Sequence, residues 1–378
     1  MKRISRRLAL LLLLGALFLR GAAGEAAPVE SLTAEDLSAT PVGQAALRTE
    51  HDLSLHIQDL YDDYAYYYTT EEFTTILEDY EGTFGGVGIS MINNADGNIE
   101  VYAVLDDGPA HDTEIQPGDI ILSADGENLL GCDSALAVTK IRGEIGQPVT
   151  LGLRRPDGTE YQVTLVRQEI TSESVEGELF EEVPGTAYIY VYDFTEQTTG
   201  EFIQTYNELQ QEETLDAIIL DLRSNGGGSL NAAIGIANLF VPAGECILQE
   251  KTEAGMIEYT ANDGQLHGTE LVILMNEYSA SASEVLAGAL RDQAGAVLIG
   301  ATSYGKGVTQ TIASLRSGGG IRYTRSHYYL PSGYDLHKVG LVPDVTVELP
   351  EDIQREEYWS TDPALNPDLA AARDYLLQ

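Results

Sequence analysis

Basic residues are scarce in this 378-residue chain, which has 21 lysines and arginines against 60 aspartates and glutamates and a formal net charge of −39. Such a surface repels phosphate groups, so we expect no nucleic acid and no anionic lipid as partners. Cysteine is nearly absent, since only Cys132 and Cys246 occur, and two cysteines cannot form a disulfide framework. The six histidines show no HExxH spacing and there is no CxxC pair, so we expect no metal.

Long apolar runs are also missing, except at the start of the chain. Residues 1–24 place Lys2, Arg3, Arg6 and Arg7 before the run LALLLLLGALFL, which small residues follow. This is the layout of a secretory signal peptide, and the run is too short for a comfortable membrane span. An uncleaved N-terminal anchor is the competing interpretation. Both predict an extracytoplasmic protein, either secreted or attached to the outer face of the membrane.

The rest of the sequence changes character several times, which predicts more than one domain. Residues 25–80 show apolar spacings of three to four, typical of a helical region, and TTEEF resembles a capped helix start. Residues 81–168 contain short β-like runs separated by turns, with one helical stretch. Residues 169–350 alternate strands with helices, which indicates an α/β layer architecture. Residues 351–378 form a polar tail.

Three serines alternate with alanines in NEYSASASEVLAGAL, directly after the apolar run LVILM and before a helical pattern. A helix N-cap is the simplest interpretation, because serine is a preferred cap and glutamate in the first turn suits the helix dipole. A second loop, DLRSNGGG, also follows an apolar strand, and its glycines let the backbone approach a ligand closely. Side by side, the two loops would form a nucleophile next to an oxyanion hole.

A serine hydroxyl needs a base to become a nucleophile. His267 and His327 occupy what look like ordinary surface or strand positions. Lys306, in TSYGKGVTQ, lies between glycines after the strand AVLIG. A lysine can act as a base if burial lowers its pKa, because desolvation disfavours the ammonium form. Taken alone, an isolated GKG is more typical of an exposed turn.

These motifs follow one another in the order FGGVGI, DLRSNGGG, SASASE, GKGVTQ, YYLPSG and GLVPDV. Together, over residues 44–348, they resemble the carboxyl-terminal processing (tail-specific) proteases, serine/lysine peptidases with an embedded PDZ domain. The resemblance implies an α+β multidomain fold, with a crotonase-like ββα protease core at 169–350 and a PDZ domain inserted before it at 81–168. It also implies a serine endopeptidase without a cofactor, which processes or degrades proteins recognised by apolar C-terminal tails.

Matched residue by residue, the resemblance makes Ser281 the nucleophile, Lys306 the base and Gln310 the residue that orients the lysine. The family pattern usually reads GKG-S-V-Q, so the two residues before Gln310 differ here. A catalytically silent scaffold that only binds tails is one rival interpretation, and the intact set of three residues argues against it. An acyl-CoA-type enzyme on a related fold is another, and both the lysine motif and the PDZ domain argue against that.

The oxyanion hole implied by the resemblance consists of two backbone N–H groups. One belongs to Ala282, next to the nucleophile. The other belongs to a glycine of the DLRSNGGG loop, for which we choose Gly227, with Gly226 and Gly228 as alternatives.

If residues 81–168 form a PDZ domain, backbone N–H groups of the GGVGI loop are predicted to bind a C-terminal carboxylate. The peptide would then add as a strand to the edge of the domain's sheet. Val138 and Ile141 are candidates for the pocket of the last side chain and equally for plain core. Arg142 matches an arginine in the family's IRG segment. The resemblance implies that this arginine senses an occupied PDZ domain and links it to the active site. An activating partner protein and a homo-oligomer are further expectations. The residues predicted to bind the peptide backbone are Gly86, Val87, Gly88 and Ile89.

Overall fold

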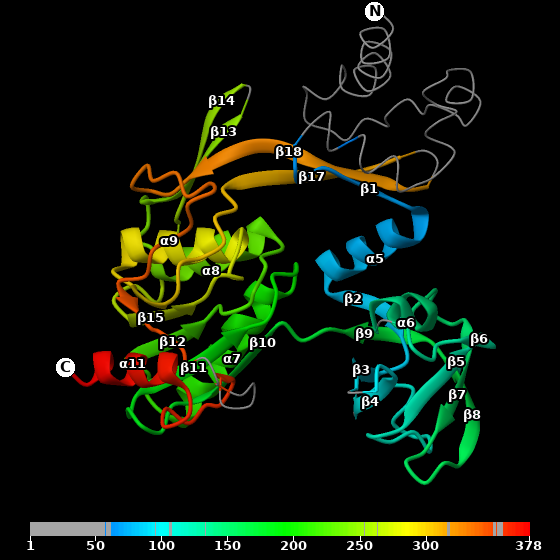
Figure 1. Ribbon diagram of the computed structural model, residues 1–378. Coiled ribbons are helices and arrows are strands. Elements are labelled where there is room, and N and C mark those ends of the chain that lie inside the picture. Colours follow the sequence, from blue (N-terminus) through cyan, green and yellow to red (C-terminus); the bar gives the residue numbers. More distant parts are fainter. Residues whose placement is uncertain are drawn as a thin grey trace, which may run out of the picture. The chain divides into compact units, whose positions relative to one another are not determined.

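The computed structural model describes residue 57 and residues 62–378, apart from 95, 106–107, 133, 253, 263, 316–317, 351–352 and 354–357. The predicted signal peptide and most of the predicted N-terminal helical region therefore lie outside the described residues. The chain divides into two compact units, and their helices and strands are labelled in Figure 1. The first comprises Met1–Ile76, Lys251–Gly255 and Val308–Tyr328, and the second comprises Leu77–Glu250, Met256–Gly307 and Tyr329–Gln378. No helix within the described ranges is long and apolar enough to cross a bilayer.

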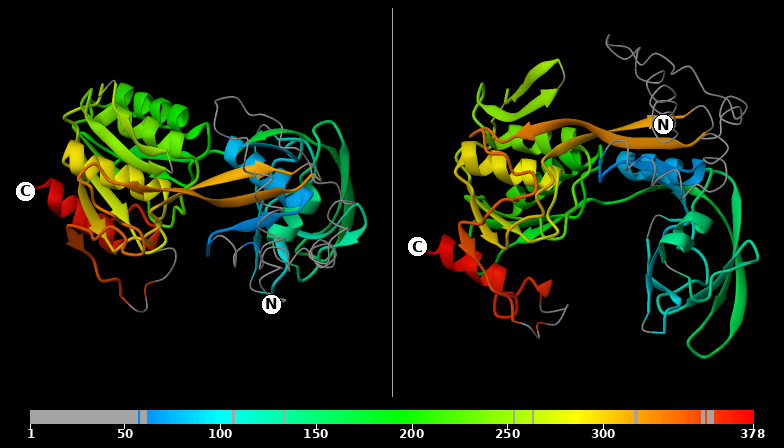
Figure 2. Two further views of the ribbon diagram at one scale, coloured as in Figure 1. Left: turned by 90° about the horizontal axis from the view of Figure 1, so that it is seen from above. Right: turned by 45° about the horizontal axis from the view of Figure 1, so that its top comes forward.

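The first unit contains strands β1 (Tyr66–Tyr68), β17 (Val308–Ser314) and β18 (Gly320–Tyr329). β17 and β18 form a long antiparallel hairpin, drawn in orange in Figure 2, and β1 pairs with β18. The helical prediction is wrong for Tyr66–Tyr68, because consecutive aromatic side chains favour the pleated backbone of a strand. The capped helix start is confirmed, since Thr69 and Glu72 exchange reciprocal side-chain to backbone bonds where α5 (Thr70–Glu81) begins.

The β-rich domain of the second unit is built from antiparallel strands around an apolar core. The sheet order is β3-β4-β5-β7-β8, β6 pairs with β5, and β2 pairs separately with β9. Val101, Ile121 and Leu151 are fully buried in the core. The elements are β2 (Thr83–Gly86), β3 (Ile89–Asn93), β4 (Ile99–Val104), β5 (Ile120–Ala124), β6 (Glu127–Asn128), α6 (Ser134–Ile141), β7 (Pro148–Arg154), β8 (Glu160–Val166) and β9 (Gln168–Thr171).

The α/β core contains a six-stranded sheet in the order β10-β11-β12-β15-β16-β19. β10 runs antiparallel to β11, and every other neighbouring pair is parallel. The strands are β10 (Val175–Leu179), β11 (Thr186–Val191), β12 (Ala217–Asp221), β15 (Glu270–Met275), β16 (Val297–Gly300) and β19 (Val345–Thr346), and β13 (Cys246–Thr252) with β14 (Gly255–Thr260) forms a hairpin. The helices are α7 (Thr198–Glu212), α8 (Leu230–Phe240), α9 (Ala282–Ala294) and α11 (Pro367–Leu376).

Helices cover both faces of this sheet, which explains why β12 and β15 read as continuous apolar runs. α8 and α9 lie on one face and α11 lies on the other (Figure 1). Leu369 and Ala372 of α11 are buried in one cluster with Ile219 and Val272 of the sheet. The polar tail predicted from residue 351 onward therefore includes a packed helix.

Candidate active site

Three loops leave the carboxyl ends of adjacent parallel strands. The glycine loop (residues 222–229) follows β12, the serine loop (276–281) follows β15, and the lysine loop (301–307) follows β16. Because parallel neighbours end at the same edge of a sheet, the three loops lie side by side, where ligand sites of open α/β sheets form.

The serine loop holds Ser281 in a strained backbone conformation at the start of α9. Its φ and ψ are 57° and −113°, a region that residues with a side chain seldom adopt and that is concentrated at functional sites. Ser279 and Ser283 are buried, and their hydroxyls donate to the carbonyls of Leu222 (2.8 Å) and Asn225 (2.9 Å). These two serines therefore anchor the serine segment to the glycine loop, whereas Ser281 is half-buried at the edge of the sheet.

Gly227 lies directly against the serine loop. Its φ is 103°, and a Cβ there would come within 2.8 Å of the Ser281 Cβ and 3.0 Å of the Ala282 nitrogen. Only glycine permits this approach, so the two amides predicted to form an oxyanion hole do lie near each other. The Gly227 N–H, however, donates to Oδ1 of Asn225 at 2.9 Å. In this conformation that donor is engaged.

Asn225 is a residue whose importance the sequence did not signal. It is fully buried, and its Nδ2 donates to the carbonyl of Val191 at 2.8 Å. Its own carbonyl accepts the Ala280 N–H at 3.0 Å. One side chain thus fixes the glycine loop to β11 and sets the direction of the Gly227 amide.

Glu284 is the second residue whose role the sequence did not reveal, because SASASE reads as an ordinary helix-capping pattern. Its carboxylate is fully buried. Oε2 accepts the backbone N–H groups of Ser281 (2.9 Å) and Lys306 (2.8 Å). Oε1 accepts the Gly305 N–H at 2.7 Å and the Ser303 hydroxyl. A single carboxylate therefore holds the backbone of the serine loop next to that of the lysine loop.

Lys306 and Gln310 belong to different compact units. Lys306 is half-buried in the lysine loop, and Gln310 lies on β17, where its Nε2 donates to the carbonyl of Tyr64 at 3.0 Å. The two histidines considered from the sequence, His267 and His327, are exposed. In the part of the chain that the structure describes, no cluster of three or more His, Cys, Asp or Glu side chains could hold a metal ion.

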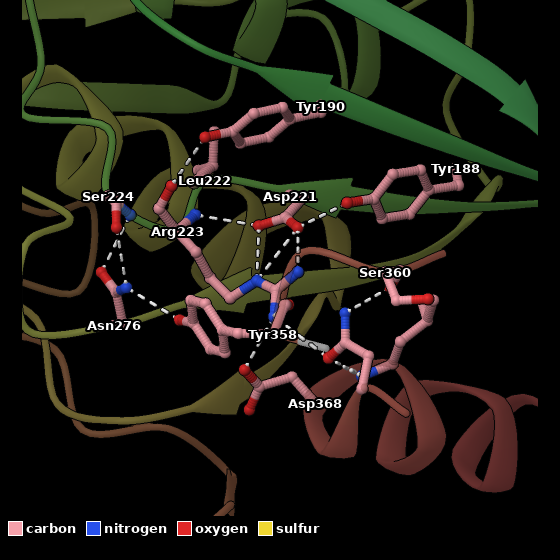
Figure 3. Close-up of polar contacts among 12 residues, drawn as sticks. Tyr188, Tyr190, Asp221, Leu222, Arg223, Ser224, Asn276, Tyr358, Ser360 and Asp368 are labelled. Atoms are coloured by element: carbon pink, nitrogen blue, oxygen red, sulfur yellow. Dashed lines mark hydrogen bonds and ion pairs between the residues drawn. The ribbon is translucent and has the colours of Figure 1, made fainter. Parts of the chain in front are cut away.

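A buried ion-pair network lies at the start of the glycine loop (Figure 3). The Arg223 guanidinium contacts Asp221 at 2.6 Å and Asp368 at 3.0 Å, and all three side chains are buried or nearly so. It also donates to Oδ1 of Asn366 at 3.1 Å. Burial raises the pKa of the Asp368 carboxyl, and the Arg223 charge offsets this only in part. The bonds from Arg223 to Asp368 and Asn366 tie the C-terminal segment to the glycine loop.

The predicted tail-binding loop leads into β3, which is an edge strand of its sheet. Gly88 has a φ of 71°, and a Cβ there would lie 2.6 Å from the Cα of Gly108, so glycine is required. An edge strand beside a glycine-containing loop has the backbone groups to accept an added strand. Ile141 is buried in the domain core, whereas Val138 is half-buried.

Arg142 contacts the segment that precedes the β-rich domain. Its guanidinium donates to Asp79 of α5 at 2.8 Å and lies 3.6 Å from the ring centroid of Phe84. The next residue of α5, Tyr80, accepts the N–H of Glu196 at 2.9 Å. Two residues before Glu196, the backbone N–H of Phe194 donates to the carbonyl of Gly227 at 3.3 Å. The segment that contains Phe194 and Glu196 therefore connects α5 with the glycine loop.

Comparison with known proteins agrees with this architecture. Residues 85–166 match the family model of the PDZ domain, and residues 185–347 match that of peptidase family S41. With both in one chain, the molecule falls in the class of PDZ-containing peptidases. The chain is 33% identical over 301 residues to the carboxy-terminal-processing protease of Bartonella bacilliformis, covering 76% of this chain and 67% of the relative. It belongs to peptidase family S41, the family of the carboxyl-terminal-processing serine proteases.

A second relative and one solved structure are also similar to this chain. The carboxyl-terminal-processing protease of Synechocystis sp. is 35% identical over 285 residues, which cover 74% of this chain and 66% of the relative. The chain thus spans about two thirds of the length of these two relatives. A solved structure of a Bacteroides fragilis protein assigned to the S41 proteases has the same fold, with a TM-score of 0.53, 16% identity and coverage of 96% of this chain and 94% of that one.

Proposed function

We propose that this protein is a serine endopeptidase in which Ser281 and Lys306 form the catalytic pair. The observation that carries the proposal is the Glu284 carboxylate, whose Oε2 accepts both the Ser281 and the Lys306 backbone N–H. Each bond is shorter than 3 Å, so the two backbone nitrogens lie within about 6 Å of each other. At that separation a lysine side chain has the length to reach the serine hydroxyl.

In the proposed reaction the Ser281 Oγ attacks the scissile carbonyl carbon while the neutral Lys306 amine takes the hydroxyl proton. The resulting ammonium gives that proton to the departing amine, and water then hydrolyses the acyl-enzyme by the same route. The role of Gln310 in orienting the lysine stays a prediction from the sequence. The crotonase-like description of the core stays a prediction.

The oxyanion of the tetrahedral intermediate would be stabilised by the Ala282 N–H and a glycine-loop N–H. Gly227 has the required proximity, but its amide would first have to leave Asn225. If it does not, Gly226 or Gly228 supplies the donor. A rearrangement of this kind would let a resting enzyme become active when a substrate tail binds.

Substrate selection is proposed to lie in the PDZ domain. A free C-terminal carboxylate would bind the backbone of Val87, Gly88 and Ile89, and the tail would add to β3. Arg142 is proposed to sense the tail, because its partner Asp79 adjoins Tyr80, which is bonded to the segment leading to the glycine loop. We further propose an extracytoplasmic location, and an activating partner and a homo-oligomer stay predictions from the sequence.

The test is the Ser281→Ala variant, assayed on an unfolded protein such as casein. It should lose activity by orders of magnitude, because no other group forms the acyl-enzyme, and it should no longer react with a fluorophosphonate probe. Ser279→Ala is the matched control, since it loses the hydrogen bonds of the Ser279 hydroxyl with the Leu222 carbonyl and the Asn276 N–H, at a cost of about 1–3 kcal/mol each, but keeps the nucleophile. Equal activities of the two variants would show that the nucleophile is misassigned.

A further inference from the structure

A cavity of about 540 Å³ opens on the face of the six-stranded sheet that α11 partly covers. Its floor is the β10–β11 pair at the end of the sheet. The register places Tyr188 opposite Glu178 and Tyr190 opposite Glu176. Because side chains alternate along a strand, these four and Tyr192 project from one face. Trp359 of the C-terminal segment forms a wall.

The aromatic lining is continuous. The ring centroids of Tyr190 and Tyr192 are 4.3 Å apart, and those of Tyr190 and Trp359 are 5.5 Å apart. Glu176 and Glu178 are exposed beside these rings, and the Tyr192 hydroxyl donates to the Glu176 carboxylate. Aromatic faces attract cations, and carboxylates pair with them directly.

No basic side chain lines the cavity among the described residues. Arg223 lies behind one wall, with its guanidinium carbon 5.2 Å from the centroid of the Trp359 ring. Its charge is already paired with Asp221 and Asp368. Within the described part of the chain, the lining therefore combines carboxylates and π-faces without a basic side chain, and the formal net charge of the whole chain is −39.

We propose that this cavity binds a basic side chain, arginine above all, of a polypeptide partner. The planar guanidinium stacks on aromatic rings and forms paired bonds with carboxylates, which fits this lining better than an ammonium does. The cavity is larger than one side chain needs, and β10 is the edge strand of its sheet, so a peptide backbone can lie beside it. This site is separate from the serine loop and does not depend on the proposed peptidase mechanism.

The site lies next to the glycine loop through direct bonds (Figure 3). The Tyr188 hydroxyl donates to Asp221 at 2.7 Å, and the Tyr190 hydroxyl donates to the Arg223 carbonyl at 3.3 Å. A partner bound in the cavity would therefore contact the side chains that hold the start of the glycine loop.

Trp359 is the single tryptophan of the chain, so intrinsic tryptophan fluorescence reports on the cavity itself. We would titrate the full chain with acetyl-Gly-Arg-Gly-amide and with the same peptide carrying citrulline, which is neutral and of similar shape. The arginine peptide should change the fluorescence in a saturable way. The citrulline peptide should bind about tenfold more weakly or worse, because it lacks the charge-assisted bonds.

Glu176→Gln combined with Glu178→Gln should weaken the arginine peptide by a similar factor without changing the thermal unfolding temperature. Glu212→Gln, an exposed glutamate at the end of α7, is the matched control and should bind normally. Equal binding of the citrulline peptide, an unaffected double variant, or no response to the arginine peptide would overturn the proposal. Methylguanidinium binding as tightly as the peptide would show a site for small cations and would also overturn it.

Discussion

Replacing Glu284 by glutamine tests whether one buried carboxylate aligns the serine loop with the lysine loop. Glutamine has the same shape but offers one acceptor oxygen, and it places an NH₂ group where a carboxylate oxygen stood. If the NH₂ replaces Oε2, the N–H groups of Ser281 and Lys306 lose their acceptor. The lysine loop should then move relative to the nucleophile.

The magnitude follows from the bonds lost. A hydrogen bond to a charged group contributes about 1.5–3 kcal/mol, so two of them amount to about 3–6 kcal/mol. The neutral side chain no longer carries the desolvation cost of a buried carboxylate. We therefore expect the free energy of unfolding to fall by an amount near the lower limit, about 3 kcal/mol. If the same free energy is lost in the transition state, kcat/KM falls about 100-fold.

The assay is kcat/KM on a fluorogenic peptide, with thermal unfolding measured in parallel. Glu250→Gln is the matched control, because Glu250 is also buried and accepts a hydrogen bond, from the Tyr259 hydroxyl at 2.7 Å, but lies on β13. It should lower stability while the folded enzyme keeps its kcat/KM. Native kcat/KM in Glu284→Gln would refute the alignment role.

Three other substitutions test separate parts of the proposals. Lys306→Ala should be nearly inactive, and native kcat/KM should rise with pH, because only a neutral amine accepts the serine proton; a native rate in the variant would point to another base. Arg142→Ala should reduce stimulation by tail peptides more than basal cleavage, and amidated tails should bind more weakly than free ones in calorimetry. Equal affinities would argue against the backbone nest. Asp368→Asn should lower the free energy of unfolding in urea by about 1–3 kcal/mol, because Arg223 loses a buried charged partner; an unchanged midpoint would contradict the anchoring of the tail.

Much of the architecture could be predicted from local patterns. Apolar runs such as LDAIILDLR and ELVILM predicted buried strands, and each ended in a loop of glycines or serines. The alternation with helical stretches indicated parallel neighbours, whose carboxyl ends lie together. The position of Ser281 at the turn from strand to helix could be predicted in the same way, because a strand run and a helical period meet there.

Tertiary structure alone decided which groups hold these loops in place. Glu284 reads locally as a capping residue, yet it bonds the lysine loop 22 positions away. The Gly227 amide depends on the direction of the Asn225 side chain, which burial against β11 sets. Arg223 pairs with Asp368, 145 positions along the chain, and so fixes a segment that looked like a polar tail. A buried polar group must find a partner, but its own sequence neighbourhood does not say which one, because the partner is supplied by whichever strands and helices pack beside it.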